Sequence, residues 1–470
     1  MSDTPLLLWF RRDLRLSDHP MLTAAVETGR PLVPVFILDP ETERLGAAAK
    51  WRLGRGLAVF GAALRAAGSR LILRRGPALR VLQGLLAETG AAGVHWSRLY
   101  DPASRARDAG VKSALREEGR IAVSHPGHLL HEPWTVMTGQ GGPYRVYTPF
   151  WNAVAARDCP APLPRVSALC VPQDWPASDA LDDWHLGAAM QRGEAIVAAH
   201  TKAGEAAAEA RADAFLGGAV AGYSTGRNMV AEAGTSGLSP HLALGEIGPR
   251  RLWHGAVRAE GEGRKGAFTF RKELVWRDFA HHLLYHTPQL ATANWKPEWD
   301  AFPWQGDNDH AEAWRRGMTG QPFVDAAMRE MYVTGTMHNR SRMVVASYLT
   351  KHLMTDWRVG AAWFDDCLTD WDPASNAMGW QWVAGSGPDA APYFRVFNPA
   401  TQAETYDPAA TYRKRWIAEM SGNPGTDALS YFDAVPRSWR LEPGQPYPRP
   451  IVDLAAGRAR ALAAYAARNT

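Results

Sequence analysis

The stretch DWDPASNAMGWQWVAGSGPDAAPYFRVFN, residues 370–398, is the part of the chain around which the rest is organised. It is rich in chemically active side chains, namely Asp370, Asp372, Asn376, Trp380, Trp382 and Arg395. Apolar, charged and amide groups alternate without a helical or strand repeat, and Gly379, Gly385 and Gly387 interrupt any long element. We therefore predict a loop-rich pocket floor. The alternative is a long surface loop whose aromatic side chains turn inward.

The sequence before and after this stretch is predominantly helical. From residue 206 onward, patterned apolar runs of helical type recur, for example at 325–332 and 343–354. We find no internal repeat and no low-complexity tract there. Residues 206–470 are therefore predicted to form one large all-α domain that contains the stretch 370–398.

The beginning of the chain has a different pattern. Short apolar runs alternate with helical stretches such as 51–67 and 77–88; the runs are LLLWF, PLVPVFIL, LILRR, GVHWS and RIAVS. This alternation predicts an α/β domain with a doubly wound, Rossmann-like parallel sheet over residues 1–130. No GxGxxG motif follows the first run, so the nicotinamide-binding fingerprint is missing. Residues 131–205 are rich in proline and are predicted to be an interdomain connector.

Composition limits the class of protein. With 470 residues, of which 46% are hydrophobic and 21% charged, the chain is globular and long enough for two or three domains. Its three cysteines lie far apart, which excludes a disulfide framework and a four-cysteine iron–sulfur cluster. The first apolar run ends at Arg11 and Arg12, and no run reaches membrane-spanning length, so we expect a cytoplasmic protein. A net charge of +4 permits nucleic-acid binding without requiring it.

Several motifs resemble those of the DNA photolyase and cryptochrome family, and they occur in the family's order. They are WFRRDLRLSDHP (9–20), TSGLSP (235–240), RKELVWRDF (271–279), MHNRSRM (337–343), the stretch 370–398 and YPRPIVD (447–453). The resemblance implies an α/β first domain followed by a large all-α domain that binds FAD. It is closest to bacterial photolyases that act on cyclobutane pyrimidine dimers, and the segment GTMHNR is similar to that of the bacterial subgroup called class III.

The resemblance implies one set of residues that bind FAD. Ser239 and Pro240 are predicted to be the N-cap and first residue of a helix, a junction that attracts phosphate, although most such starts are only caps. In the family, this segment contacts the flavin pyrophosphate. The implied FAD contacts are Tyr223, Thr235, Ser236, Gly237, Leu238, Ser239, Asn339, Arg342, Asp370, Asp372 and Asn376.

Two of these assignments have chemical consequences. Asn376 matches the residue that faces the reactive flavin nitrogen, and a neutral amide there cannot readily donate a proton, which favours the fully reduced anion. Asp370 and Asp372 could instead hold a metal or act as a general acid–base pair. We reject that interpretation because no third ligand lies nearby in sequence and the family uses these acids for the flavin.

A second set of residues is implied to bind damaged DNA. Glu273, Trp276 and Arg277 are spaced to share one helical face, which a surface ion pair beside a core tryptophan would also explain. In the family, the acid stabilises the damaged base pair, the tryptophan stacks on it and the arginine meets phosphate, as a flipped-out substrate requires. The implied DNA and lesion contacts are Arg227, Glu273, Trp276, Arg277, Arg340, Met343, Trp382 and Arg395.

Tryptophan is more frequent than either of the other aromatic residues, with 20 Trp against 14 Phe and 13 Tyr. This excess suggests stacking or electron transfer as well as packing. Trp304, Trp357 and Trp380 match the family's chain of tryptophans, through which an electron moves inward from the surface to reduce the flavin. Three ordinary core tryptophans are the alternative. Together with Glu273 and Asn376, these are the residues implied to be catalytic.

The resemblance implies a deoxyribodipyrimidine photolyase. Such an enzyme uses blue light to transfer an electron from reduced FAD to a cyclobutane pyrimidine dimer in UV-damaged DNA. The family branch that acts on (6-4) photoproducts has histidines where this chain has Asn339 and Met343, which favours the cyclobutane dimer.

Two alternatives remain. A cryptochrome-type photoreceptor would use the same photochemistry for signalling, but Asn376, Trp276 and Trp382 argue against it, as does the short sequence after residue 453. A nucleic-acid-binding flavoprotein without a light reaction is the other, and the tryptophan series makes it less attractive.

The resemblance also implies a second, light-harvesting chromophore. Ala103 and Ser104 occupy positions where a folate-binding pattern of the family has Asn-Glu, so the usual folate site is altered. The class III resemblance still favours methenyltetrahydrofolate over a deazaflavin. We expect the protein to act as a monomer.

Overall fold

The computed structural model describes residues 4–389 and 394–468. The first part of the chain forms one parallel sheet whose strands are ordered β3-β2-β1-β4-β5. The strands are β1 (Leu6–Phe10), β2 (Leu32–Leu38), β3 (Ile72–Arg75), β4 (Gly93–Ser97) and β5 (Ile121–His125). Each coincides with one of the five predicted apolar runs, and the predicted doubly wound α/β class is confirmed.

Helices cover both faces of this sheet, which explains why its strands are almost continuously apolar. Alternate residues of β1 serve the two faces: Leu6 and Leu8 belong to one buried cluster, and Leu7 and Trp9 to the other. The first cluster includes α1 (Pro20–Val26) and α3 (Ala47–Ala66), and the second includes α4 (Ala78–Thr89) and α5 (Pro102–Glu117). A short helix, α2 (Pro40–Glu43), follows β2.

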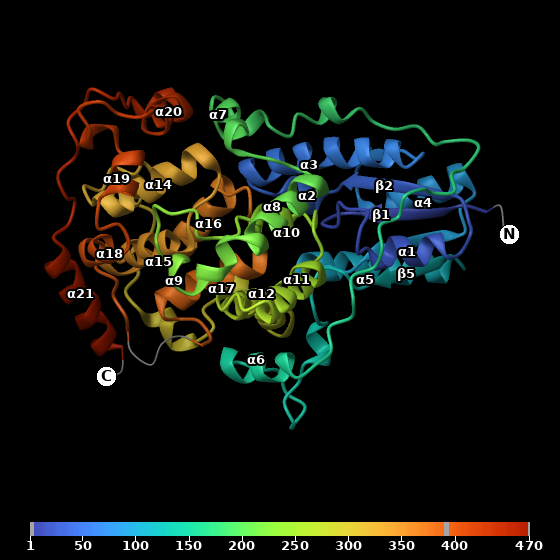
Figure 1. Ribbon diagram of the computed structural model, residues 1–470, viewed down its shortest axis with the longest axis horizontal. Coiled ribbons are helices and arrows are strands. Elements are labelled where there is room, and N and C mark those ends of the chain that lie inside the picture. Colours follow the sequence, from blue (N-terminus) through green and yellow to red (C-terminus); the bar gives the residue numbers. More distant parts are fainter. Residues whose placement is uncertain (1–3, 390–393, 469–470) are drawn as a thin grey trace.

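The proline-rich connector crosses the surface from the sheet to the helical half (Figure 1). Residues 160–180 form no helix or strand, as the prolines predict. Two short helices occur in it, α6 (Tyr147–Ala155) and α7 (Gly193–His200). Both pack on the helical half, α6 against α12 and α7 against α14.

The remainder is helical, as predicted, and lies beside the sheet domain with the chain ends at opposite sides of the molecule (Figure 1). Its helices are α8 (Glu205–Gly217), α9 (Tyr223–Gly226), α10 (Ser239–Ala243), α11 (Pro249–Gly261), α12 (Gly266–His286), α13 (Asp309–Arg315), α14 (Pro322–Thr334), α15 (Asn339–Ser347), α16 (Trp357–Cys367), α17 (Pro373–Ala384), α18 (Pro399–Tyr406), α19 (Thr411–Trp416), α20 (Thr426–Ala434) and α21 (Leu454–Ala467). No helix in the described part of the chain is both long and apolar enough to cross a lipid bilayer.

The prediction of a loop-rich segment at 370–398 is wrong for its first half, which forms α17, and residues 390–393 of this segment lie outside the described residues. The start and stop signals of a helix were present. The side chain of Asp372 caps the N-terminus by accepting from the backbone N–H of Ser375 at 2.8 Å, and Pro373 follows it. Gly385, with a φ of 95°, ends the helix in the left-handed conformation. These local signals outweigh the mixed polarity of the segment.

A buried ion pair joins the sheet domain to the helical half. Arg52 of α3 donates to both carboxylate oxygens of Glu246, at 2.9 and 2.5 Å, and both side chains are fully buried. His241 contacts the same carboxylate. Nearby, the backbone of the loop after β1 lies so close to Gly245 (φ 63°) that a Cβ there would be 2.1 Å from the carbonyl oxygen of Arg12. The two halves are therefore tightly fitted at this point.

We predict that Glu246→Ala lowers the free energy of unfolding by about 3–5 kcal/mol, because Arg52 would remain buried without its anion. Urea denaturation followed by circular dichroism measures this. The control is Asp427→Ala, which breaks the exposed Arg415–Asp427 pair and should cost less than about 1 kcal/mol. A loss no larger than that of the control would contradict the prediction.

Candidate active site

Asp370 is a buried acid that is only half satisfied by the protein. Its Oδ2 accepts from Nη2 of Arg342 at 2.7 Å. The guanidinium is fixed in turn, because its Nε donates to the carbonyl of Met337 at 2.9 Å. Oδ1 of Asp370 is buried and has no hydrogen-bond partner among the described residues. Such an oxygen is costly unless a ligand donates to it, so the pair Asp370–Arg342 is well suited to bind one.

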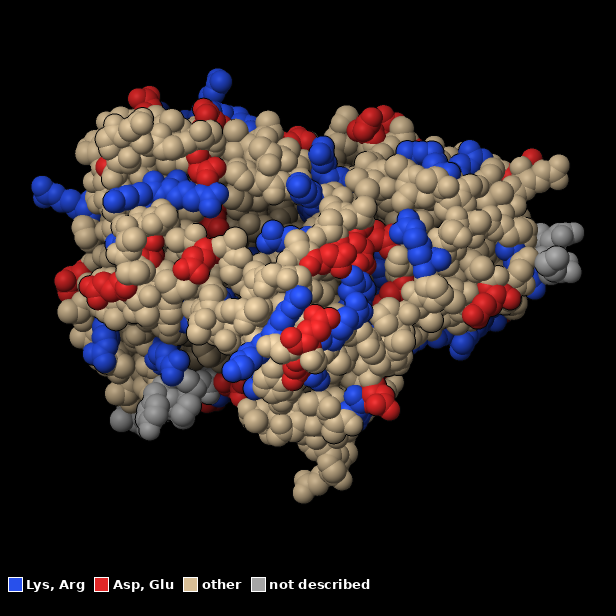
Figure 2. All heavy atoms as spheres, viewed as in Figure 1, with Lys and Arg blue, Asp and Glu red and all other residues tan. Residues whose placement is uncertain are grey.

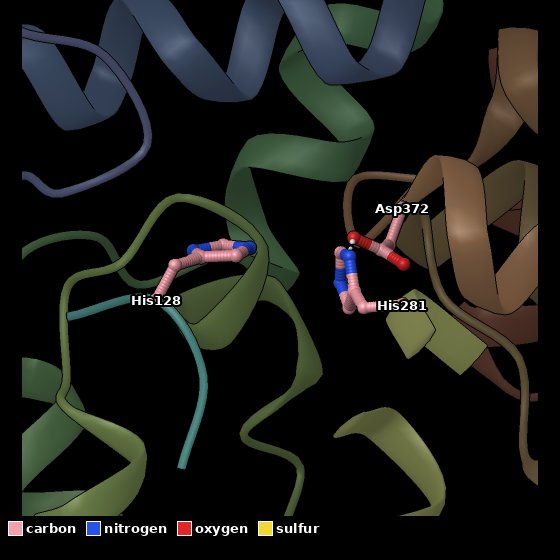
Figure 3. Close-up of side chains that lie close together, drawn as sticks. All are labelled: His128, His281 and Asp372. Atoms are coloured by element: carbon pink, nitrogen blue, oxygen red, sulfur yellow. Dashed lines mark ion pairs between the residues drawn. The ribbon is translucent and has the colours of Figure 1, made fainter. Parts of the chain in front are cut away.

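Asp372 caps α17 and also contacts both halves of the molecule. Its Oδ2 lies 3.2 Å from Nε2 of His281 on α12 (Figure 3) and 3.6 Å from Nη1 of Arg12, in the loop after β1. Burial by itself would raise the pKa of Asp372, but His281 and Arg12 hold it well below its usual range. Asp372 is therefore an anion at neutral pH, held partly by a residue of the sheet domain.

His128, from the segment after β5, completes a buried group with His281 and Asp372 whose potential metal-ligand atoms all lie within 4.8 Å of one another (Figure 3). The sequence argument against a metal missed these imidazoles because they are remote in the chain. Cations already surround the group, however. Arg277 donates to the carbonyl and to Nε2 of His128, at 2.7 and 2.9 Å, and Arg12 faces Asp372. We therefore assign the group a role in holding Asp372, and no metal.

Arg277 is consequently not placed as expected. Both terminal nitrogens of its guanidinium are engaged by His128, and burial lowers its pKa. Burial and the guanidinium likewise keep the pKa of His128 well below its ordinary value, so that the imidazole is neutral and can accept. The Arg277 guanidinium is therefore not available for the expected contact with DNA phosphate. It connects α12 to His128, in the segment that follows β5.

Asn376 and Trp380 lie one turn apart on α17, so they project from the same side of the helix. Nδ2 of Asn376 donates to the carbonyl of Ala361 on α16 at 3.1 Å. Trp380 is buried and lies across Gly360, also on α16, where a Cβ would be 2.0 Å from Cη2 of the indole. Only glycine at position 360 allows this approach.

The three tryptophans of the expected electron-transfer chain differ in burial. Trp357 and Trp380 are buried, whereas Trp304 is partly exposed. This gradient agrees with a path from the surface inward. Within the described residues, the ring pairs connect Trp380 to Phe364 and Trp314, and Trp304 to Trp299 and Phe302, and not the three tryptophans to one another. Their order as a chain therefore stays a prediction.

The segment 235–239 precedes α10 but does not cap it as expected. Ser239 is the first helical residue, and Leu238 occupies the cap position without a side-chain hydrogen bond. The predicted N-cap role of Ser239 is wrong by one position. Ser236 accepts from the backbone N–H of Leu238 at 3.4 Å, and the carbonyls of Thr235 and Ser236 are held by Arg211. Gly237, between Ser236 and Leu238, is exposed.

Tyr223 and Arg227 lie on the side of α12 that carries Glu273. Tyr223 is buried, with its ring edge-on to Phe270 at 5.7 Å. Arg227 forms an ion pair with Glu273, and its guanidinium lies over the Tyr223 ring at 5.4 Å. The acid expected to meet the lesion therefore already has a cationic partner in this structure.

Trp276 and Trp382, the expected walls of the lesion site, are both partly exposed. Trp276 stacks on Tyr147 of α6, with ring centroids 3.6 Å apart and planes at 6°. The indole N–H of Trp382 donates to the carbonyl of Asp389 at 3.1 Å. Half-exposed indoles that are firmly held are available for stacking with a base.

The remaining predicted residues lie at the surface side of the site. Arg340, on α15, donates to Asn228 at 2.6 Å and lies over the ring of Tyr406 at 4.3 Å. Asn339 and Arg395 are exposed and Met343 is partly exposed. Asn339 is the first residue of α15 and is not brought to Asp370 by any contact among the described residues.

The donor and acceptor set fits FAD. Asp370 Oδ1 and Trp380 Nε1 are buried and lack a hydrogen-bond partner within the described residues. The hydroxyl, amine and carbonyl groups of a flavin dinucleotide would supply such partners. Sequence reasoning missed Arg12, His128, His281 and Tyr147. Arg12 lies in the motif WFRRDLRLSDHP, but no local signal marked it, and His128, His281 and Tyr147 lie outside the motifs that carry the resemblance.

Known proteins are similar to this chain over nearly its whole length. Residues 6–167 match the family model described as DNA photolyase, and residues 270–467 match that described as FAD binding domain of DNA photolyase. The deoxyribodipyrimidine photo-lyase of Agrobacterium fabrum is 46% identical, over 99% of this chain and 98% of the relative. The crystal structure of a bacterial class III photolyase from Agrobacterium tumefaciens superposes with a TM-score of 0.90 at 45% identity, covering 100% of this chain and 98% of that chain.

A cryptochrome is also similar. The Synechocystis cryptochrome structure superposes with a TM-score of 0.84 at 28% identity, over 98% of this chain and 100% of that chain. The family models, the full-length identity and the shared fold together cover nearly the whole sequence. The chain therefore belongs to the DNA photolyase and cryptochrome family.

Proposed function

We propose that this protein is a deoxyribodipyrimidine photo-lyase, which uses blue light to repair cyclobutane pyrimidine dimers in UV-damaged DNA. The observation that carries the proposal is the half-exposed, stacked Trp276, one helical turn from Glu273 and its partner Arg227. It provides an aromatic surface beside paired polar groups, which a flipped-out base pair requires. The 46% identity to a photo-lyase over the full length supports the same conclusion.

Reduced FAD, when bound, supplies the excited electron that splits the dimer. The protein's part is to hold this cofactor and its surroundings in place. The carboxylates of Asp370, held by Arg342, and of Asp372, held by His281, would accept hydrogen bonds from the cofactor, and the Arg342 guanidinium could donate to it. Asn376 presents a neutral amide that its bond to Ala361 keeps in position.

Attraction to DNA is expected to be local. On the face shown in Figure 2, Lys and Arg side chains are interspersed with Asp and Glu and do not form one positive field. Arg227, Arg340 and Arg395, which the family resemblance implies, are proposed as the phosphate contacts near the site, and Arg277 is left out because His128 engages its guanidinium. Such contacts position the duplex, while the aromatic walls select the lesion.

A photoreceptor remains the second candidate, because a cryptochrome shares the fold at a TM-score of 0.84. Trp276 and Trp382 favour repair over signalling, since a sensor needs no stacking surface for damaged bases. The site residues carried over from the family, the division into 1–130, 131–205 and 206–470, a cytoplasmic location and a monomeric state remain predictions.

The antenna is also a proposal. We propose methenyltetrahydrofolate, in preference to a deazaflavin, as the second chromophore. Ala103 and Ser104 lie in the first turn of α5, where the Ser104 side chain is buried and its backbone N–H donates to Asp101 at 3.0 Å. Extraction of pigment from the purified protein identifies any bound chromophore.

The first functional prediction is light-dependent repair. Reduced protein mixed with a thymine oligonucleotide that contains cyclobutane dimers should restore the bases under blue light and not in darkness, as measured by chromatography. A sample that binds FAD yet leaves the dimers intact in light would refute repair and favour sensing. A sample that does not bind FAD would refute both.

The second concerns Trp380. Trp380→Phe should abolish light-driven reduction of the bound flavin, because phenylalanine is much harder to oxidise than an indole, whereas chemically reduced protein should still repair. Absorbance during illumination measures the first effect and the oligonucleotide assay the second. Trp253→Phe, a buried tryptophan outside the series, is the control. Undiminished photoreduction in Trp380→Phe would remove this residue from the electron path.

A further inference from the structure

One face of the Trp276 indole packs against Tyr147, a residue that has no role in the proposed repair reaction. The ring of Tyr147 lies parallel to it, with centroids 3.6 Å apart and an interplanar angle of 6°. Phe279 meets the same indole edge-on, at 5.7 Å and 72°. One broad face of Trp276 is therefore occupied by protein, and the partly exposed side chain can offer only its other face to a base.

Tyr147 is itself held in place. It is the first residue of α6, and it is buried. Its hydroxyl donates to the carbonyl of Lys272 at 2.7 Å, on the same helix as Trp276. Burial and the nearby carboxylate of Glu273 raise the pKa of Tyr147, so the hydroxyl keeps the proton that it donates. The connector helix is thus attached to α12 by a ring stack and a hydrogen bond at adjacent points.

The same tyrosine lies next to the residue that holds the other wall. The carbonyl of Asp389 accepts from the indole N–H of Trp382 at 3.1 Å. Burial raises the pKa of the Asp389 carboxylate, and a hydrogen bond from the backbone amide of Tyr147 opposes that rise. Asp389 adopts a φ of 51°, which is uncommon for a residue with a side chain. The supports of Trp276 and Trp382 therefore meet at the start of α6.

We propose that Tyr147 is a positioning residue for lesion recognition, which fixes the plane of Trp276 so that the indole is ready to stack on a flipped-out pyrimidine dimer. The inference rests on the proposed repair function. A half-exposed indole without this support would have to be ordered when the lesion binds, and that ordering would weaken binding. Undamaged DNA, which does not enter the site, would be bound as before.

The test compares Tyr147→Ala, Tyr147→Leu and Tyr147→Phe in the FAD-containing protein, with affinity measured for one duplex with and without a thymine dimer. Loss of the stack should raise Kd for damaged DNA roughly 3- to 10-fold in the Ala and Leu variants, while Kd for undamaged DNA stays constant. Tyr147→Phe keeps the ring and should distinguish damaged from undamaged DNA as well as the wild-type protein does. Tyr144→Ala is the control, because the Tyr144 ring packs edge-on against Phe150 instead.

A double variant tests whether Tyr147 acts through Trp276. In a Trp276→Ala background, Tyr147→Ala should cause no further loss of discrimination. Unchanged discrimination in Tyr147→Ala and Tyr147→Leu would overturn the proposal. Loss of bound FAD from both variants would also overturn it, because Tyr147 would then serve the fold of the flavin site, whereas a lower Tm alone is expected when a buried ring is truncated. A wild-type protein that does not prefer damaged DNA would instead refute the repair function itself.

Discussion

Charge buried between the sheet domain and the helical half is the constraint on which this structure depends. Arg52 and Glu246 have no access to water, and each is tolerable there only because the other is present. The loop after β1 adds Arg15, which is buried and donates to the carbonyl of Gly245 at 3.0 Å. Any displacement of one half relative to the other would separate ions in a medium of low polarity. The relative position of the halves is therefore strongly fixed.

The candidate active site is also held rigidly, because Asp372 contacts residues on both sides of the interface between the sheet domain and the helical half. Asp372 is contacted by Arg12 from the sheet domain and by His281 from α12. His128 and Arg277 extend the contacts to the segment that leaves β5. The sheet domain thus contributes directly to the electrostatic surroundings of Asp372, which we propose as a flavin contact. The connector does the same for the lesion side through α6.

The sequence was informative where its signals are local. The five strands lie at the predicted apolar runs, and the helical half follows its periodic pattern. The pairing of Asp370 with Arg342 joins two residues that the resemblance had assigned to the same ligand. The sequence also contains the start and stop signals of α17, namely Asp372, Pro373 and Gly385. The mixed polarity of the residues between them favoured a loop instead, and that prediction was wrong.

Contacts between distant segments could not be predicted in this way. His281 and His128 are separated from Asp372 by long stretches of chain, and no pattern in one segment specifies the other. The same is true of Arg277, whose spacing from Glu273 suggested an outward direction but whose guanidinium turns toward His128. Helical spacing defines a face of the helix, whereas the neighbouring segment decides whether that face meets water or protein.

The placement of Asn376 and Trp380 on one side of α17 has a consequence for how such proteins diverge. Because the helix rises about 1.5 Å per residue, these side chains stand about 6 Å apart on a single stiff rod. With Asn376 at the flavin and Trp380 in the electron path, as proposed, a tilt of that helix would alter both functions together. Gly360 limits any such tilt, since the indole already touches the backbone of α16. Evolutionary change between repair and signalling is therefore easier by exchanging single side chains along α17 than by moving the helix.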